Sequence, residues 1–236
     1  TENWVEDLRV VKDESELLFI QQAAEIADAA IEQVSAELKP GMTELEVANR
    51  LNTLMRSLSA KKEAFDLIVA SGSRAAMPHA ASSERVIGAG ETIVMDIGAQ
   101  FAGYHSDLTR TICIDKINRK FAEVYEIVEN AQAAAIKAVT PGISCVELDA
   151  VARAVITDAG YADCFGHGLG HGVGLEVHES PAVSRFGKGE IRPGMVFTVE
   201  PGIYIPGEGG VRIEDMVVAT EEGCRLLTKS PHQLMK

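Results

Sequence analysis

The sequence has no apolar run of roughly 18 or more residues, the length that a membrane-spanning helix needs. Its first residues, "TENWVEDLRVVKDE", lack the basic start and the apolar middle of a signal peptide. Basic residues are also few, because 22 Lys and Arg stand against 35 Asp and Glu, a formal charge of -13. Phosphate binding needs a basic face, so this balance excludes nucleic acid and an anionic membrane as partners. We therefore expect a cytoplasmic protein with carboxylates to spare for cations.

Cysteine pairs at metal-binding or redox spacing are absent as well. The chain has 4 cysteines, all isolated in the sequence, and the lack of a CxxC pair excludes a zinc knuckle and a redox motif. We interpret them as small buried thiols. With 236 residues, 46% of them hydrophobic, the chain can bury one substantial core or two closely packed halves.

Helical periodicity and stop signals predict four helices in two pairs. The first helix runs from Glu14 to a stop at Pro40, and a second amphipathic run follows a Thr43/Glu46 capping-box pattern. A third helix covers residues 120–139, and the capping-box spacing recurs at residues 144 and 147 before a fourth helix. Strand-like and hairpin-like runs follow each helix pair, whereas residues 1–12 are polar and read as a linker or an N-terminal extension.

This order of elements, helix, helix, strand and hairpin, occurs twice and predicts an internal repeat. "KPGMTELEVA" matches "TPGISCVELDA", and "GETIVMDIG" parallels "GMVFTVEPG", with both matches separated by about 100 residues. We place the two copies at roughly residues 13–115 and 118–230. The fold class is therefore α+β, with two pseudo-symmetric halves and a site expected between them.

Four acidic residues stand at related places in the two predicted hairpins. Asp96 and Asp107 are equidistant from a turn centred between residues 101 and 102, so this register would put them opposite each other on one face. Glu200 and Glu214 repeat the arrangement about Gly207. A slip of one residue would turn either acid of a pair to the other face.

These acids would ordinarily be solvated groups on exposed strand faces. Asp96 and Glu200, however, each follow an uninterrupted apolar run that is typical of strands buried on both faces. A buried unpaired carboxylate costs several kcal/mol, so four of them indicate a compensating metal charge. Four carboxylates and one imidazole suit two divalent ions, with Mn²⁺ preferred and Co²⁺ or Zn²⁺ as alternatives. A pair of metals of this kind is typical of hydrolytic enzymes.

Four motifs then resemble a known family. "MDIGAQFAGYHSDLTRT", "GHGLGHGVGLEVHES", "VEPGIYI" and "RIED", in this order, are similar to the metal-site motifs of the pita-bread metallopeptidases, most closely their Xaa-Pro aminopeptidase and prolidase branch. The resemblance covers roughly residues 13–230. It implies a pita-bread fold, with a curved antiparallel sheet and helices on its outer face, and a catalytic domain spanning residues 13–236.

The resemblance also implies the roles of individual residues. Five of them are metal ligands, with the second and the last bridging both ions: Asp96, Asp107, His171, Glu200 and Glu214. His79 and His178 contact the substrate and the tetrahedral intermediate, and Glu200 is the general base as well as a ligand. His167 lines the substrate site without binding metal. The spacing rather than the resemblance points to Arg212, which stands two residues before Glu214 and so on the same strand face. We expect it to balance the acids or to bind a substrate carboxylate, with a plain structural ion pair as an equal alternative.

The activity expected from the resemblance is hydrolysis of the N-terminal Xaa-Pro bond of short peptides or dipeptides. Two alternatives stay open: removal of an N-terminal Met, as in methionine aminopeptidases, and a non-catalytic binding module on the same fold. One departure concerns the N-terminus, because members of the Xaa-Pro branch usually carry a further domain before the pita-bread unit. A homodimer and the limit on substrate length are therefore left open.

Overall fold

The computed structural model of the chain describes residues 4–232 and 235. Its α-helices are α1 Trp4–Val10, α2 Glu14–Glu37, α3 Glu44–Ser57, α4 Arg119–Ala138 and α5 Cys145–Asp158, and short 3-10 helices cover Gly72–Ala76 (η1) and Ala162–Cys164 (η2). The four predicted helices are confirmed as α2 to α5. Helix α1 was not predicted, and it lies in the segment expected to be a linker or an extension.

Capping side chains explain where the helices begin. Thr43 and Ser144 each accept a hydrogen bond from the backbone of a glutamate three residues on, and that glutamate bonds back to the cap, as predicted. Asp13 and Glu16 form a third capping box at the start of α2. Each box satisfies backbone N–H groups that the first turn leaves without partners, so the helix starts are fixed locally.

The strands form antiparallel sheets in the middle of the molecule. The order β2-β3-β6 builds one sheet, β13-β12-β9-β7-β8 a second, and β1-β4-β5 and β10-β11 two smaller ones. The bounds are β1 Lys62–Glu63, β2 Ile68–Ser71, β3 Thr92–Ile97, β4 Ala99–Phe101, β5 Tyr104–His105, β6 Leu108–Cys113, β7 Gly170–Gly172, β8 Glu179–Val183, β9 Val196–Val199, β10 Gly202–Ile205, β11 Gly209–Arg212, β12 Asp215–Ala219 and β13 Cys224–Leu226.

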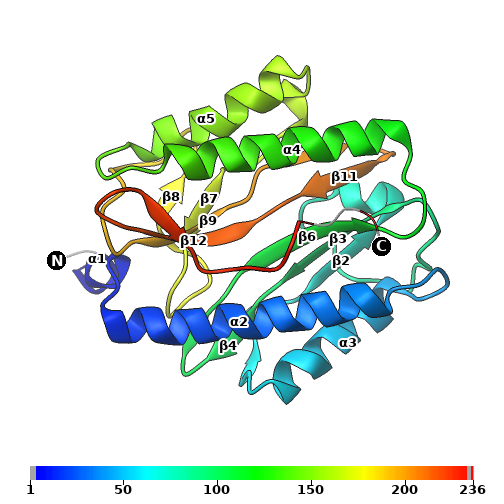
Figure 1. The fold of residues 1–236 in the computed structure, drawn as a ribbon, viewed down its shortest axis with the longest axis horizontal. Coiled ribbons are helices and arrows are strands. Elements are labelled where there is room, and N and C mark those ends of the chain that lie inside the picture. The colour runs from blue at the N-terminus through cyan, green and yellow to red at the C-terminus, as the bar shows by residue number, and fades with distance from the viewer. Residues whose placement is uncertain (1–3, 233–234, 236) are drawn as a thin grey trace.

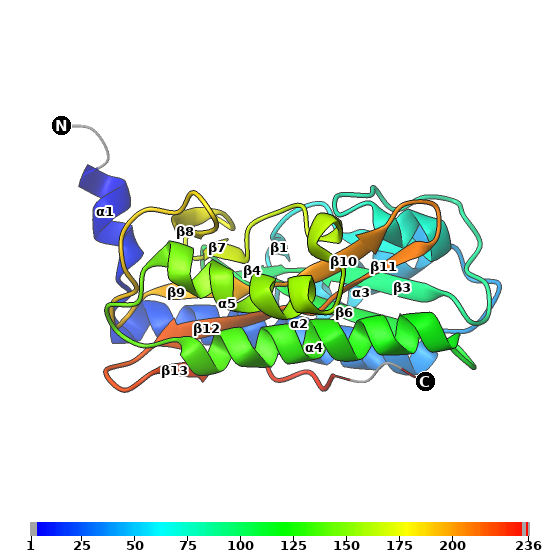
Figure 2. The same ribbon diagram turned by 90° about the horizontal axis from the view of Figure 1, so that it is seen from above.

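Two similar halves meet along these sheets. In Figure 1, α4 and α5 lie above the strands and α2 and α3 lie below them, and Figure 2 shows α2 and α4 along one side of the sheets. One apolar core gathers residues between 26 and 114, and another gathers residues from 113 to 219 together with Val10. A third cluster joins Ile20 and Ala24 of α2 to strand residues of the second half. The two halves therefore have their own cores and share a common border.

The border lies at the centre of the sheets. The N–H of Glu214 donates to the carbonyl of Thr109 at 3.1 Å, which links β6 of the first half to the end of β11 in the second. Two residues further along β6, the Thr111 hydroxyl donates to the carbonyl of Arg212 at 2.8 Å and accepts from the N–H of Arg212 at 3.0 Å. Backbone from both halves therefore converges where two of the predicted acids stand.

The register of the first hairpin differs from the predicted one. Asp96 is paired with Thr109 rather than with Asp107, because the turn is centred between residues 102 and 103. Ala102 and Gly103 both have positive φ, as two-residue hairpin turns of this hand require. The shift of two residues keeps Asp107 and Thr109 at positions of equal parity, so Asp107 lies just before β6 and near Asp96 rather than opposite it.

The second hairpin has the predicted register. Gly202 pairs with Arg212 and Val199 with Asp215, so Glu200 and Glu214 occupy matching positions between these pairs, equidistant from Gly207.

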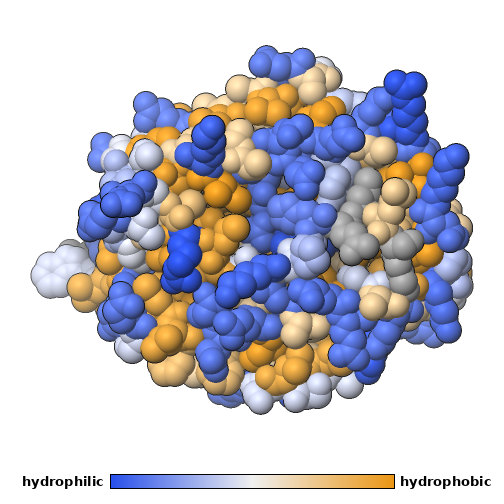
Figure 3. All heavy atoms as spheres, in the orientation of Figure 1, coloured by the Kyte–Doolittle hydropathy of each residue, from blue (hydrophilic) through white to orange (hydrophobic). Residues whose placement is uncertain are grey.

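Of the described helices, none is both long and apolar enough to cross a membrane. The face of the molecule in Figure 3 mixes hydrophilic and hydrophobic residues.

Candidate metal centre

A cavity of about 790 Å³ lies between the two halves. All nine site residues named from the sequence line it: His79, Asp96, Asp107, His167, His171, His178, Glu200, Arg212 and Glu214. They come from both hairpins, from β7 and from the loops before β7, after η1 and before β8. Residues far apart in the sequence are therefore brought to one place.

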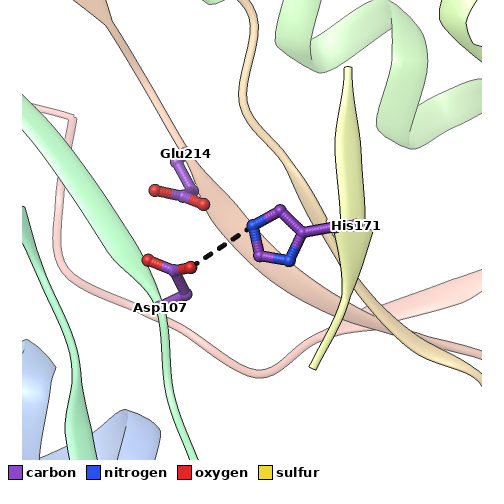
Figure 4. A group of neighbouring side chains, drawn as sticks. All are labelled: Asp107, His171 and Glu214. Atoms are coloured by element: carbon purple, nitrogen blue, oxygen red, sulfur yellow. Dashed lines mark ion pairs between the residues drawn. The ribbon is translucent and has the colours of Figure 1, made fainter. Parts of the chain in front are cut away.

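Three of these side chains form a compact group of potential metal ligands. One ligand atom each from Asp107, His171 and Glu214 lies within 4.8 Å of the other two, and Figure 4 shows the carboxylates and the imidazole facing one another. Asp107 and Glu214 are almost fully buried, with 4% and 2% exposure. Glu200 approaches the same ring nitrogen as Asp107, with its Oε1 3.4 Å from the Nε2 of His171.

The hydrogen bonding of His171 fixes which ring nitrogen faces the acids. Its Nδ1 lies 3.1 Å from the carbonyl oxygen of Gly172, which can only accept, so Nδ1 carries the proton of the neutral ring. Burial lowers the pKa of His171 and favours this neutral form. Its Nε2 then presents a lone pair 3.5 Å from Asp107 Oδ2 and toward Glu200. Three acceptors therefore converge without a donor between them, which is an arrangement that suits a cation.

Asp96 completes the acidic set from the first hairpin. Its Oδ2 accepts a hydrogen bond of 2.6 Å from Nη2 of the buried Arg212, whereas its Oδ1 is buried without a hydrogen-bond partner. A buried oxygen of this kind costs free energy unless another group, such as a cation, binds it. Arg212 therefore offsets one of the four acids, and one oxygen of Asp96 is left for a further partner.

The other three acids all have raised pKa values, which also indicates a missing positive charge at this site. Burial, and next the charge of Glu214, raise the pKa of Asp107 well above its usual range. Burial, and next the charge of Glu200, do the same to the pKa of Glu214, and burial raises the pKa of Glu200 to about 8. Acids that resist ionisation for want of a counter-charge fit two divalent cations, which would supply that charge.

The three remaining histidines lie around the acids in different ways. His178 contacts His171, with the ring centroids 4.2 Å apart, and His79 is exposed in the loop after η1. His167 is half-buried, and both of its ring nitrogens have other partners than the acids: its Nδ1 lies 2.8 Å from the Gly168 carbonyl and its Nε2 lies 2.8 Å from the hydroxyl of Tyr204. Burial lowers the pKa of His167 to about 4, so its Nε2 accepts from the Tyr204 hydroxyl.

Tyr204, Thr109 and Thr198 contact the site and were not among the predicted residues. The Tyr204 oxygen accepts from Arg212 Nη1 at 2.9 Å, and burial raises the pKa of this tyrosine to about 12. The hydroxyls of Thr109 and Thr198 donate to Glu214 at 2.6 Å and to Glu200 at 3.1 Å. Alternation along β10 gives a signal for Tyr204, which stands four residues after Glu200. The two threonines had no comparable signal.

Two glycines within residues 165–180, the segment that contains His167, His171 and His178, allow close contact between strands. A Cβ on Gly170 would lie 1.9 Å from the carbonyl oxygen of Thr198, and one on Gly172 would lie 2.1 Å from that of Ser180. No other residue fits at these distances, so glycine lets β7 pack against its neighbours. His171 is held between these two contacts. The segment is therefore a fixed strand at this point rather than a mobile loop.

Comparison with known proteins places this centre in a family. The profile of metallopeptidase family M24 matches residues 19–221. An Xaa-Pro dipeptidase of Pyrococcus horikoshii is 47% identical over 231 residues, which is 98% of this chain and 66% of that protein. The chain thus spans somewhat less than two thirds of the length of that relative.

Solved structures agree with this placement. The Xaa-Pro dipeptidase from Bacillus anthracis superposes with a TM-score of 0.98 at 46% identity, covering 100% of this chain and 66% of that one. The X-Pro aminopeptidase from Thermotoga maritima gives 0.98 at 43% identity, covering 100% and 67%. These superpositions confirm the predicted α+β pita-bread fold. A family match over most of the chain, with a buried acid and histidine centre, shows that this protein belongs to metallopeptidase family M24.

Proposed function

We propose that this protein is a dinuclear metal-dependent peptidase that hydrolyses the N-terminal Xaa-Pro bond of dipeptides or short peptides. The observation that carries the proposal is the convergence of four carboxylates and one neutral imidazole on a cavity shared by both halves. The preference for proline rests on the relatives, since two proteins named Xaa-Pro dipeptidase are 47% and 46% identical to this chain. The binding partners proposed for this chain are therefore its short peptide substrates.

Five side chains would hold two divalent cations: Asp96, Asp107, His171, Glu200 and Glu214. Asp107 and Glu214, the two most buried of these four acids, face each other and would be shared by both cations, as the family resemblance implies. The predominance of oxygen ligands favours Mn²⁺, with Co²⁺ and Zn²⁺ as alternatives. When bound, the two cations supply Lewis-acid polarisation of the scissile carbonyl and acidify a water molecule.

Glu200 handles the proton of the reaction. Its place beside His171, at 3.4 Å from the ring, suits a carboxylate that takes a proton from the attacking water. The Thr198 hydroxyl donates to its Oε1 and holds that oxygen in place, which leaves the other oxygen to receive the proton. The proton then passes to the proline nitrogen as the C–N bond breaks, so the leaving amine is neutral.

His178 and His79 act on the substrate from the open side of the cavity. His178, packed on His171, would donate to the developing oxyanion, and His79 would contact the substrate or the leaving nitrogen. His167 lines the substrate site, and the hydrogen bond from Tyr204 orients its ring. The bond from Arg212 to Asp96 supports the role of balancing the acids over that of binding a substrate carboxylate.

Residues 13–236 form the catalytic unit in this proposal, preceded by residues 1–12. A homodimer and a cytoplasmic location stay predictions.

A peptide panel with Mn²⁺ tests the proposal. The panel contains Gly-Pro dipeptides, Xaa-Pro-Xaa tripeptides and Met-Ala-Xaa tripeptides. We expect cleavage before proline, with dipeptides alone indicating a prolidase and the longer peptides an aminopeptidase. Cleavage of Met-Ala peptides alone would replace the proposal by methionine aminopeptidase activity. No cleavage by a fully metallated chain would leave a binding module.

A further inference from the structure

The segment between β7 and β8 carries His178 into the cavity, and it is held at its start by His105, whose N–H donates to the carbonyl of Gly174 at 2.8 Å. Within residues 174–179, the N–H of Gly174 donates to the carbonyl of Glu176 at 3.0 Å. The N–H of Glu176 donates to the side chain of Glu179 at 3.0 Å. The carboxylate of Glu179, the residue next to His178, therefore helps to hold the part of the segment beyond Gly174.

That carboxylate is held by two cationic side chains from the N-terminal segment. Arg9 donates to Glu179 Oε1 from Nε at 3.1 Å and also from Nη2. Lys12 donates from Nζ to Glu179 Oε2 at 3.3 Å. The side chains of Glu179 and Lys12 are only 6% and 1% exposed, and that of Arg9 is 21% exposed. Both oxygens of Glu179 are thus engaged by residues about 170 positions away in the sequence.

The N-terminal segment is itself anchored to the catalytic sheet. The N–H of Lys12 donates to the carbonyl of Gly194 at 2.9 Å, and Val11 forms an antiparallel bridge with Met195, just before β9. Val10 is buried in the core of the second half. Figures 1 and 2 show α1 at the same end of the molecule as β8. The backbone around Arg9 and Lys12 is therefore fixed, and these two side chains connect it to Glu179 in the segment that carries His178.

We propose that Arg9, Lys12 and Glu179 form a clamp that positions His178 over the metal centre, so that the residues before α2 belong to the catalytic machinery. Arg9 acts through its planar guanidinium, which engages the carboxylate with two nitrogens and so sets its orientation. The proposal rests on the function proposed above for His178. Arg9 and Lys12 are positioning residues, since they touch neither the substrate nor the reacting atoms.

Hydrogen exchange on the metal-free chain tests the clamp without any activity. We would compare wild type, Arg9→Met, Arg9→Lys and the control Arg50→Met, which removes an exposed ion pair between α3 and α2. Arg9→Met is expected to raise the exchange rate of the peptide covering residues 174–179 by at least about 5-fold, while peptides from α2 stay unchanged. Arg9→Lys is expected to restore part of the protection, and Arg50→Met to leave it as in wild type.

Kinetics on Xaa-Pro substrates supply the second readout. A misplacement of about 1 Å can cost a factor of about 100, so Arg9→Met and Glu179→Gln should each lower kcat by at least about 10-fold. KM and the metal bound per chain should stay within twofold, because the ligands are untouched. Unchanged exchange in residues 174–179 would overturn the clamp, and so would a kcat of Arg9→Met within twofold of wild type. A wild type that cleaves no peptide would refute the proposed function instead, and the exchange result would still decide on the clamp.

Discussion

Replacing Asp107 by Asn should stabilise the metal-free protein and destabilise the metal-bound one. Asp107 and Glu214 offer ligand atoms within 4.8 Å of each other, and both are nearly fully buried. At an effective dielectric constant of about 20, two charges at this separation repel by about 3 to 4 kcal/mol. The folded chain must hold this repulsion or bind a proton that the unfolded chain has already released, and Asn avoids both costs.

The sign of the effect depends on the metal. With EDTA present, we expect Asp107→Asn to raise the free energy of unfolding by about 2 to 3 kcal/mol at pH 7.5, somewhat less than the full repulsion because protonation relieves part of it. With Mn²⁺ at about 100 times its Kd, wild type should gain about 2.7 kcal/mol, whereas Asp107→Asn should lose most of that gain. Urea unfolding followed by circular dichroism measures all four values.

Asp28→Asn is the matched control, because Asp28 is also a buried acid but accepts hydrogen bonds from the N–H groups of Lys229 and Ser230. It should destabilise the chain by about 1 to 3 kcal/mol with or without metal. If Asp107→Asn is no more stable than wild type in EDTA while the control behaves as expected, the repulsion between Asp107 and Glu214 is refuted as a source of instability. Asp107 is refuted as a metal ligand if Asp107→Asn keeps the full stabilisation by Mn²⁺.

Three further outcomes follow from the same contacts. The unfolding free energy of the metal-free wild type should fall between about pH 7 and pH 8, because the raised pKa of Glu200, about 8, makes the folded chain retain protons that the unfolded chain has lost; a rise over that range, seen by urea titration, would speak against it. Gly170→Ala should abolish stabilisation by Mn²⁺ in thermal melts, since its Cβ would meet the Thr198 carbonyl at 1.9 Å and push β7 away; a melt like that of wild type contradicts this packing. Tyr204→Phe should cost about 1 to 3 kcal/mol in urea unfolding, because Arg212 and His167 each lose a hydrogen-bond partner; a neutral effect would show that neither bond matters.

Local signals in the sequence predicted much of the fold. The capping boxes at Thr43 and Ser144 act within four residues, so pattern and structure agree on where α3 and α5 begin. Gly207 has positive φ and sits at the centre of its hairpin, which made the register of the second hairpin readable. The first hairpin was misplaced because its turn uses Ala102 as well as Gly103 in the left-handed region, and alanine gives no such signal.

Long-range contacts account for what the sequence did not predict. Helix α1 is only seven residues long, and its placement depends on partners such as Glu179 that stand near the other end of the chain. The threonines that donate to Glu214 and Glu200 are likewise typical strand residues whose role arises only when the halves meet. Asp96 and Glu200 could be singled out because each follows a buried apolar run, whereas the position of Asp107 relative to Asp96 required the actual register of the first hairpin.

The number of divalent ions bound per chain is the direct test of the proposed two-metal centre. Protein dialysed against Mn²⁺ and then against metal-free buffer would be assayed by elemental analysis, with protein concentration from amino-acid analysis. We predict two ions per chain for wild type and a clear loss of bound metal for Glu214→Gln, which removes a bridging charge from the buried group shown in Figure 4. Less than one ion per chain in wild type would contradict the account.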